Sequence, residues 1–146
     1  MMKTFLLLLL VTTGLVTKAQ FRKIPPDVTD SFKVHFPDAS KVSWKDRVVY
    51  FQAEFVTGKQ VQRANFSIEG EWLKTEKILS LEQLPPEVKD GFKKSKYADW
   101  TVKEVVETRS VENGHEYRIT IRKDEFLKRY LRFSATGQLQ DDSLTF

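Results

Sequence analysis

Two stretches of the chain, "IPPDVTDSFK" (residues 24–33) and "LPPEVKDGFK" (residues 84–93), repeat one pattern about sixty residues apart. Each places two prolines before an acidic residue and then spaces apolar side chains by four, as Val28 and Phe32 do in the first stretch. Proline is tolerated in the first turn of a helix, and an acidic side chain there faces the positive end of the helix dipole. Apolar residues four apart share one helix face. The two stretches therefore predict two short amphipathic helices of the same design.

The segments after each predicted helix alternate apolar and polar side chains with a period of two. The clearest are "VVYFQAEF" (48–55), "RANFSI" (63–68), "YRITIR" (117–122) and "YLRFSA" (130–135). This alternation predicts antiparallel strands whose sheet is covered on one face only. The side chains expected to point toward the helices include Val49, Phe51, Phe66, Ile68, Ile119 and Phe133.

The whole pattern predicts an α+β fold of two tandem repeats, each with one helix packed on a four-stranded antiparallel meander sheet. Shorter strands are predicted near residues 42–44, 72–75 and 100–106 and complete the two sheets. We expect the repeats to span residues 20–80 and 81–146. They should form one compact module, because a unit of about sixty residues without disulfides is only marginally stable alone.

The N-terminal residues 1–19 have the layout of a cleavable signal peptide. Lys3 precedes an apolar run, and the small residues Thr17 and Ala19 suit a cleavage site. The run is too short for a permanent membrane span, so no integral membrane segment is expected after cleavage; an uncleaved anchor is the alternative. The chain has no cysteine, which excludes a lipid anchor on a cleavage-site cysteine and disulfides. The protein is expected to be periplasmic or secreted.

The charge does not indicate a nucleic-acid partner. Of the 24 basic residues, Lys3 and Lys18 would leave with the signal peptide. The mature chain would then have 22 basic and 20 acidic residues. Both signs are spread along the chain, whereas a nucleic-acid binder would gather positive charge on one face.

Residues suited to catalysis are scarce. The chain has no thiol nucleophile, no Gly-x-Ser-x-Gly motif and no glycine-rich phosphate loop. His35 falls on the stripe of the first helix, where a partly buried structural role is expected. His115 follows a turn and is expected to be exposed, and Asp141 and Asp142 to be solvated. We predict no catalytic residue, no cofactor and no metal site, and hence no enzyme.

The chain resembles the PepSY-like family, which is related to the beta-lactamase inhibitor proteins. The resemblance rests on "IPPDV", "VSW" (42–44), "YFQAEF" (50–55) and "NFSIEGEWLKTE" (65–76), followed by the same order from "LPPEV" onward. It implies a small exported bacterial protein with a helix-plus-four-strand unit in tandem. In inhibitors of that shape, the open sheet faces form a concave surface that grips an enzyme, and PepSY domains proper are thought to restrain peptidases.

The second repeat departs from this pattern. Glu104 or Val105 stands where the first repeat has Trp44, and Leu139 replaces Trp72. The two sheet faces are therefore not equivalent. Tryptophans at such positions belong either to the core or to its rim.

The uncovered sheet face is the predicted functional surface, because tyrosine and arginine anchor many protein interfaces. Its candidate partner-binding residues are Tyr50, Gln52, Glu54, Arg63, Asn65, Arg118, Thr120, Arg122, Tyr130 and Arg132. An ordinary solvated sheet face is the simpler interpretation of the same residues.

We therefore predict an exported, monomeric, non-enzymatic binding module that inhibits or sequesters a protein or peptide of the cell envelope. A binder of a small ligand or an envelope component, with a pocket between the repeats, is one alternative. A structural part that assembles through edge strands is another.

Overall fold

The computed structural model describes residues 22–145, so the predicted signal peptide lies outside the described residues. Each helix is followed by four strands. The elements are α1 (Pro26–His35), β1 (Ser40–Asp46), β2 (Phe51–Thr57), β3 (Gln60–Phe66), β4 (Trp72–Leu79), a 3-10 turn (Leu81–Gln83), α2 (Pro86–Lys94), β5 (Thr101–Ser110), β6 (Gly114–Arg122), β7 (Lys128–Ser134) and β8 (Leu139–Thr145). Among residues 22–145, no helix is long and apolar enough to cross a membrane.

The eight strands form one antiparallel sheet in the order β1 to β8. The antiparallel sheet and the two helices agree with the prediction, but the prediction of two four-stranded sheets was wrong. The reason is that β4 pairs with β5 over six residue pairs, from Lys74 opposite Ser110 to Leu79 opposite Val105. The interpretation of the chain as a duplicated unit stays a prediction.

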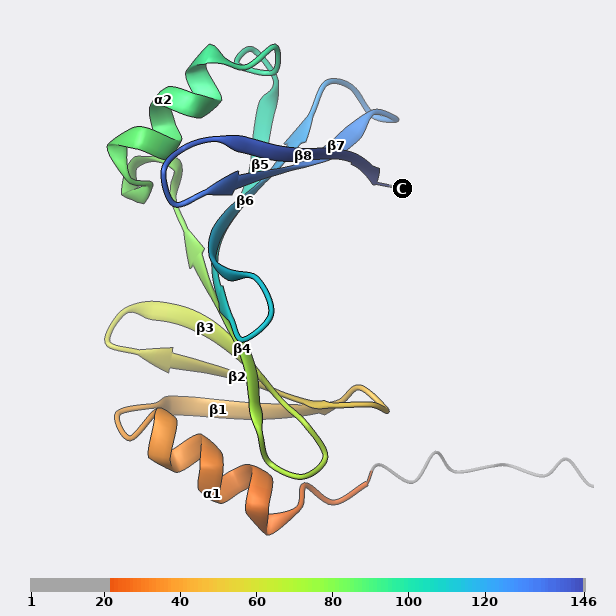
Figure 1. The fold of residues 1–146 in the computed structure, drawn as a ribbon. Helices are drawn as coiled ribbons and strands as arrows, with labels where there is room; N and C mark the ends of the chain where they lie inside the picture. The colour runs from red at the N-terminus through yellow and green to blue at the C-terminus, as the bar shows by residue number, and fades with distance from the viewer. Residues whose placement is uncertain (1–21, 146) are drawn as a thin grey trace, which may run out of the picture.

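Both helices pack on the same face of this sheet, which we call the helix face. Residues directly opposite in an antiparallel pair project to one side. Ala64, beneath α1, lies opposite Thr75, and Thr75 lies opposite Arg109. Val105, four residues before Arg109 on the same side of β5, belongs to the core beneath α2. In Figure 1 the helices lie outside the bent sheet, near its two ends, and the other face is concave.

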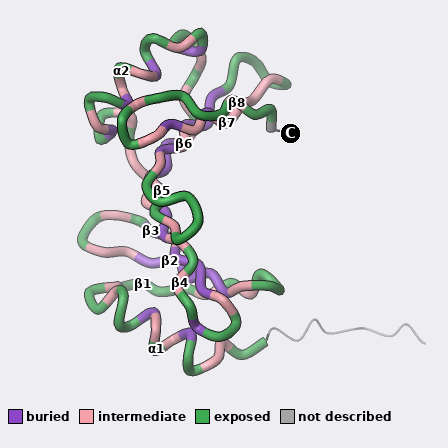
Figure 2. Tube along the Cα trace, in the orientation of Figure 1, coloured by how far each residue is buried: buried purple, intermediate pink, exposed green. Residues whose placement is uncertain are grey.

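Each helix covers its own hydrophobic core, and the two cores are separate. The buried residues of the first core are Val28, Phe32, Phe51, Ala53, Phe55, Ala64 and Phe66. Those of the second are Leu84, Val88, Phe92, Tyr97, Val105, Tyr117, Ile119, Ile121, Leu131 and Phe133. Trp44 and Trp72 pack half-buried at the edge of the first core and Trp100 at the edge of the second. Figure 2 shows buried segments in both halves of the molecule.

Some predictions failed at strand ends and turns. Val49 was expected in the core but is exposed, because β2 begins only at Phe51 and the residues before it form a bend. Ile68 is exposed because β3 ends at Phe66. His35 was expected to be partly buried, but it is exposed and stacks near Trp72, with ring centroids 6.2 Å apart.

Candidate functional site

The sheet face opposite the helices, which we call the open face, is continuous across both halves of the molecule. Arg63 on β3 lies opposite Glu76 on β4, and Glu76 lies opposite Thr108 on β5. Thr108 in turn lies opposite Glu116 on β6, and Glu116 lies opposite Ser134 on β7. Because opposed residues share a side, these five strands present one polar surface that spans the joint between β4 and β5.

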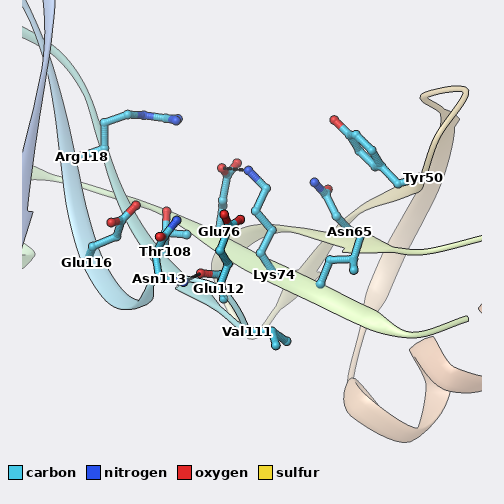
Figure 3. A pocket seen from close by; sticks show the side chains of 12 residues that line it. Tyr50, Asn65, Lys74, Glu76, Thr108, Val111, Glu112, Asn113, Glu116 and Arg118 are labelled. Atoms are coloured by element: carbon cyan, nitrogen blue, oxygen red, sulfur yellow. Dashed lines mark hydrogen bonds and ion pairs between the residues drawn. The ribbon is translucent and has the colours of Figure 1, made fainter. Parts of the chain in front are cut away.

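A hollow of about 540 Å³ lies on the open face over this joint. It is lined by Tyr50, Asn65, Leu73, Lys74, Glu76, Thr108, Ser110, Val111, Glu112, Asn113, Glu116 and Arg118. Figure 3 shows these side chains in a row that runs from Arg118, over Glu116 and Glu76, to Asn65 and Tyr50. The hollow therefore draws on both halves of the sheet and could not exist in either half alone.

A buried carboxylate lies at the centre of the hollow. Glu76 is only 6% exposed, and its Oε1 accepts a hydrogen bond of 2.7 Å from Nζ of Lys74. A charged group out of water needs such a partner, because an unpaired buried charge is strongly unfavourable. The pair holds Lys74 in the lining of the hollow, where 36% of its side chain stays exposed.

Three predicted contact residues are buried, although they lie on the open face. Gln52, Asn65 and Thr120 were expected to be exposed, and this expectation was wrong. Gln52 donates to Oδ1 of Asn65 at 3.1 Å and accepts from Arg47 at 2.9 Å, so both amides are used within the protein. All three side chains have little exposed surface. They therefore support the surface and do not form its outer layer.

Two arginines lie next to each other in the second half of the open face. Arg118 on β6 is directly opposite Arg132 on β7. The Arg118 guanidinium carbon lies 5.4 Å from the centre of the Tyr130 ring, a cation–π distance. Glu104 and Glu116 lie 3.9 Å from Arg118 and Arg132, respectively, which is close enough for charge attraction but too long for a hydrogen bond.

The Nε atoms of both arginines are buried and have no hydrogen-bond partner among the described residues. Like charges placed directly opposite each other on neighbouring strands repel. The arginine pair is thus the least satisfied charged group of the open face, and its partly exposed guanidinium groups can still bond to an acceptor from outside.

The remaining predicted residues lie around these groups. Glu54 and Arg63 form an ion pair of 3.3 Å between β2 and β3. Tyr50 lines the hollow from the bend before β2, and Tyr130 lies half-buried on β7. Arg122 is exposed at the far end of β6, opposite Lys128, and is not among the residues that line the hollow.

Sequence reasoning missed the central contributors from β4 and β5. Lys74, Glu76 and Thr108 lie in the middle of the sheet, whereas the predicted surface used only residues of the flanking strands. The alternation in "WLKTEK" (72–77) was the signal that could have placed Lys74 and Glu76 on one strand face.

The open face is rich in charged side chains and also carries tyrosines. Among residues 22–145, no three His, Cys, Asp or Glu side chains come together as metal ligands would. Several acidic side chains of the open face lie near basic neighbours, and Tyr50 and Tyr130 are among its aromatic residues. This is the composition of a recognition surface, in which arginine and tyrosine supply the anchors.

Comparison with known proteins agrees with this geometry. A family with the description "Putative beta-lactamase-inhibitor-like, PepSY-like" matches residues 49–141. The chain belongs to this PepSY-like family. The match begins just before β2 and ends in β8, so it includes the joint and the arginine pair.

Solved structures show the same PepSY-like fold. A BLIP-like protein from Bacteroides fragilis is 27% identical, has a TM-score of 0.81, and the match covers 86% of this chain and 89% of that one. A DUF2874 family protein from Bacteroides ovatus is 26% identical, with a TM-score of 0.80 and coverage of 84% and 89%. A Bacteroides eggerthii protein named "putative periplasmic" shares the fold at 22% identity, with a TM-score of 0.78 and coverage of 84% and 90%. No curated protein matches the chain.

Proposed function

We propose that this PepSY-like protein is an exported, non-enzymatic binding module that binds a protein or peptide partner in its concave open face. One observation carries the proposal: both helices pack on the same side of a single eight-stranded sheet, so that no element among residues 22–145 covers the other side. A concave, hydrogen-bonded surface of this size can enclose a protruding segment of a partner without itself rearranging.

The similarity to a BLIP-like protein supports a role in binding. Inhibition or sequestration of an envelope enzyme is the form of binding that this likeness favours. The predicted signal peptide (1–19) and the fold shared with a protein named "putative periplasmic" support a periplasmic or secreted location. The repeats 20–80 and 81–146 would each contribute half of the open face.

Within this proposal the predicted residues divide by burial. Arg118, Arg132 and Tyr130 are partly exposed and would contact the partner, together with Tyr50 at the rim. Gln52, Asn65 and Thr120 are buried and would lie beneath the contact surface. Lys74, which the sequence did not indicate, would contact the partner from the floor of the hollow.

The proposal is tested by neutralising the arginine pair. Arg118→Gln with Arg132→Gln should reduce, by roughly tenfold or more, the amount of a stoichiometric partner retained from an envelope extract of the native host. Lys33→Gln with Lys93→Gln removes the same charge from the last turns of the two helices and should leave retention unchanged. Mass spectrometry identifies the retained protein, and circular dichroism confirms that both variants are folded.

Equal retention by the arginine variant and the wild type would rule out the open face as the binding surface. The expected monomer is checked by the elution volume on a sizing column across a range of concentrations. A concentration-dependent oligomer would favour assembly through the edge strands β1 and β8 instead.

A binder of a small ligand is the second candidate, because the volume of the hollow lies within the usual range of ligand sites, about 300–1,000 Å³. Its mixed charges would suit a polar envelope component. A thermal-shift screen against glycans, short peptides and metal ions tests this: a saturable shift that Lys74→Gln abolishes would support it.

A further inference from the structure

A second hollow, of about 300 Å³, lies on the helix face where α1 ends, and we call it the helix-face hollow. Its lining comes from the end of α1 and from four neighbouring strands, and it includes His35, Gln62, Trp72, Thr75, Lys77 and Arg109. Because Arg109 belongs to β5, this hollow also depends on the pairing of β4 with β5. It lies on the side of the sheet opposite to the surface proposed to bind a protein partner.

A buried side-chain amide lines this hollow without a hydrogen-bond partner. Gln62 on β3 lies opposite Phe55 of the first core, which places it on the helix face. It is only 7% exposed, and its amide makes no hydrogen bond within residues 22–145. The amides of Gln52 and Asn65 on the open face, by contrast, bond to each other. An amide offers two donors and one acceptor, and leaving them unpaired away from water is unfavourable, so Gln62 favours a polar ligand.

Two stacked rings also line the hollow. The centroids of Trp72 and His35 lie 6.2 Å apart, and the ring planes differ by only 18°. Nε1 of Trp72 donates to Oγ1 of Thr75 at 2.9 Å, which fixes the orientation of the indole. Nδ1 of His35 lies 2.8 Å from the carbonyl oxygen of Ser31. A carbonyl can only accept, so Nδ1 carries the proton and the neutral ring keeps Nε2 as an acceptor.

The side of the hollow formed by β4 and β5 supplies positively charged donors. Arg109 lies directly opposite Thr75. Its Nε donates to Oε1 of Glu107 at 3.1 Å, which orients the guanidinium group. The terminal nitrogens of Arg109 make no bond within the described part of the chain, and 60% of the side chain is exposed. Lys77 on β4 adds a second cation to the lining.

The side formed by the end of α1 supplies acceptors instead. Asp38, which follows the helix, is the only acidic side chain among the described residues that line the hollow. Nε2 of His35 is a further acceptor, and the carbonyl end of a helix carries a partial negative charge. The hollow is therefore asymmetric, with acceptors at one end, donors and positive charge at the other, and aromatic rings and an unpaired amide in its lining.

We propose that the helix-face hollow binds a hexuronic acid, either as the free sugar or as the terminal unit of an acidic glycan. The C–H groups of a sugar ring pack against aromatic rings such as Trp72. Its hydroxyl groups both donate and accept, as the amide of Gln62 and the carboxylate of Asp38 require. Its carboxylate suits the guanidinium group of Arg109. This site does not rest on the proposed function of the open face.

Other small ligands would leave part of the lining unused. A neutral sugar would not engage Arg109 and Lys77, and an inorganic anion would not engage the rings or the amide. An amino acid would place an ammonium group near exposed Asp38 alone, which is a weak substitute for its hydration. The volume lies at the lower end of the usual range for ligand sites, about 300–1,000 Å³, and so suits a single sugar unit.

Titration of the isotope-labelled protein with D-glucuronate, followed by NMR, tests the site. The indole N–H signal of Trp72, identified by its absence in Trp72→Phe, should shift and reach saturation. D-glucose, which lacks the carboxylate, should bind roughly tenfold more weakly or worse. A disaccharide that ends in glucuronate distinguishes the sources: tighter binding than that of the free sugar assigns a glycan end, and equal binding assigns the free sugar.

Variants separate a binding role from a structural one. Gln62→Leu should weaken glucuronate binding by roughly tenfold and raise the melting temperature by about 3 °C, because an unpaired buried amide is replaced by an apolar group. A structural role for this amide would lower the melting temperature instead. Arg109→Gln should reduce the affinity for glucuronate to that for glucose at unchanged stability. Lys103→Gln removes a charge that is exposed on the same strand, outside the lining, and should change neither.

Three results would overturn the proposal: no saturable shift of the Trp72 signal, equal affinities for glucuronate and glucose, or L-glutamate binding as tightly as glucuronate. Unchanged glucuronate binding by both Gln62→Leu and Arg109→Gln would overturn it as well. The Arg118→Gln, Arg132→Gln variant should bind glucuronate like the wild type, and Gln62→Leu should retain the protein partner in full. Each site can therefore fail in its own test while the other stands.

Discussion

At the scale of single residues, the clearest electrostatic effect belongs to Asp46. The hydrogen bonds from Arg22, followed by that from the N–H of Val48, lower its pKa from 3.8 to about 2. The same pair raises the pKa of Arg22. A carboxylate whose pKa is lowered by folding stabilises the protein at any pH above its unfolded value, and this contribution is lost as the pH falls through its folded value.

We therefore predict that the Asp46 carboxyl titrates with a midpoint of about 2 in carbon-detected NMR. In Arg22→Gln the midpoint should move up toward 3.8, because the largest cause of the shift is removed. The stabilisation from this pair should be complete above about pH 4 and disappear between about pH 4 and pH 2. Lys45→Gln, which removes a neighbouring charge that makes no bond to Asp46, should leave the midpoint nearly unchanged. A midpoint close to 4 in the wild type would contradict the pairing.

At the scale of secondary-structure elements, each helix rests on a glycine turn between two strands. A Cβ built at Gly70, in the β3–β4 turn, would lie 2.7 Å from the carbonyl oxygen of Asp27 in α1. Gly137, in the β7–β8 turn, approaches Glu87 in α2 in the same way. The contact of α2 with its turn is closer than that of α1. Gly91 in α2 faces Gly137, whereas α1 has Ser31 at the corresponding position.

This packing predicts that Gly91→Ala destabilises the protein although alanine favours helices. The added Cβ would collide with the carbonyl oxygen of Gly137, and such overpacking typically costs about 1–3 kcal/mol. This outweighs the gain in helix propensity of about 1 kcal/mol. Ser31→Ala is the matched control in α1 and should be neutral or slightly stabilising. Urea denaturation of both variants checks this, and a stabilised Gly91→Ala would show that α2 can move away from its turn.

At the scale of the whole molecule, two separate cores are connected through the pairing of β4 with β5. No residue is shared between the two buried clusters. Hydrogen bonds along six residue pairs hold the halves in one sheet. Such an arrangement allows each half to open without the other, because cooperativity depends on shared buried contacts.

We therefore predict that a cavity in one core affects mainly its own half. Phe66→Ala and Phe133→Ala should each cost about 3–5 kcal/mol of local stability. By hydrogen-exchange mass spectrometry, Phe66→Ala should lose protection mainly in α1 to β4, and Phe133→Ala mainly in α2 to β8. Equal loss across both halves in either variant would show that the molecule unfolds as a single unit.

The sequence by itself determined the elements, the buried side chains and the direction in which most polar residues point. Proline, acid and four-residue spacing define the helices around Val28 and Val88, and period-two alternation places Phe51 and Ile119 in the cores. These are local properties, since a helix or strand pattern is read over about ten neighbouring residues. Residues such as Arg118 and Tyr130 could be found as surface candidates for the same reason.

The tertiary structure alone decided how the halves combine. Side-chain alternation is the same for an edge strand as for a paired one, so nothing local indicates that β4 bonds to β5 across the intervening α2. That pairing joins the two halves into one concave face and creates the hollow around Glu76. Val48 likewise has a positive φ of 70°, and its carbonyl oxygen accepts a hydrogen bond from Arg22, a residue 26 positions away in sequence. Backbone pairing and curvature are non-local, and the site formed by them could therefore be seen only in the folded chain.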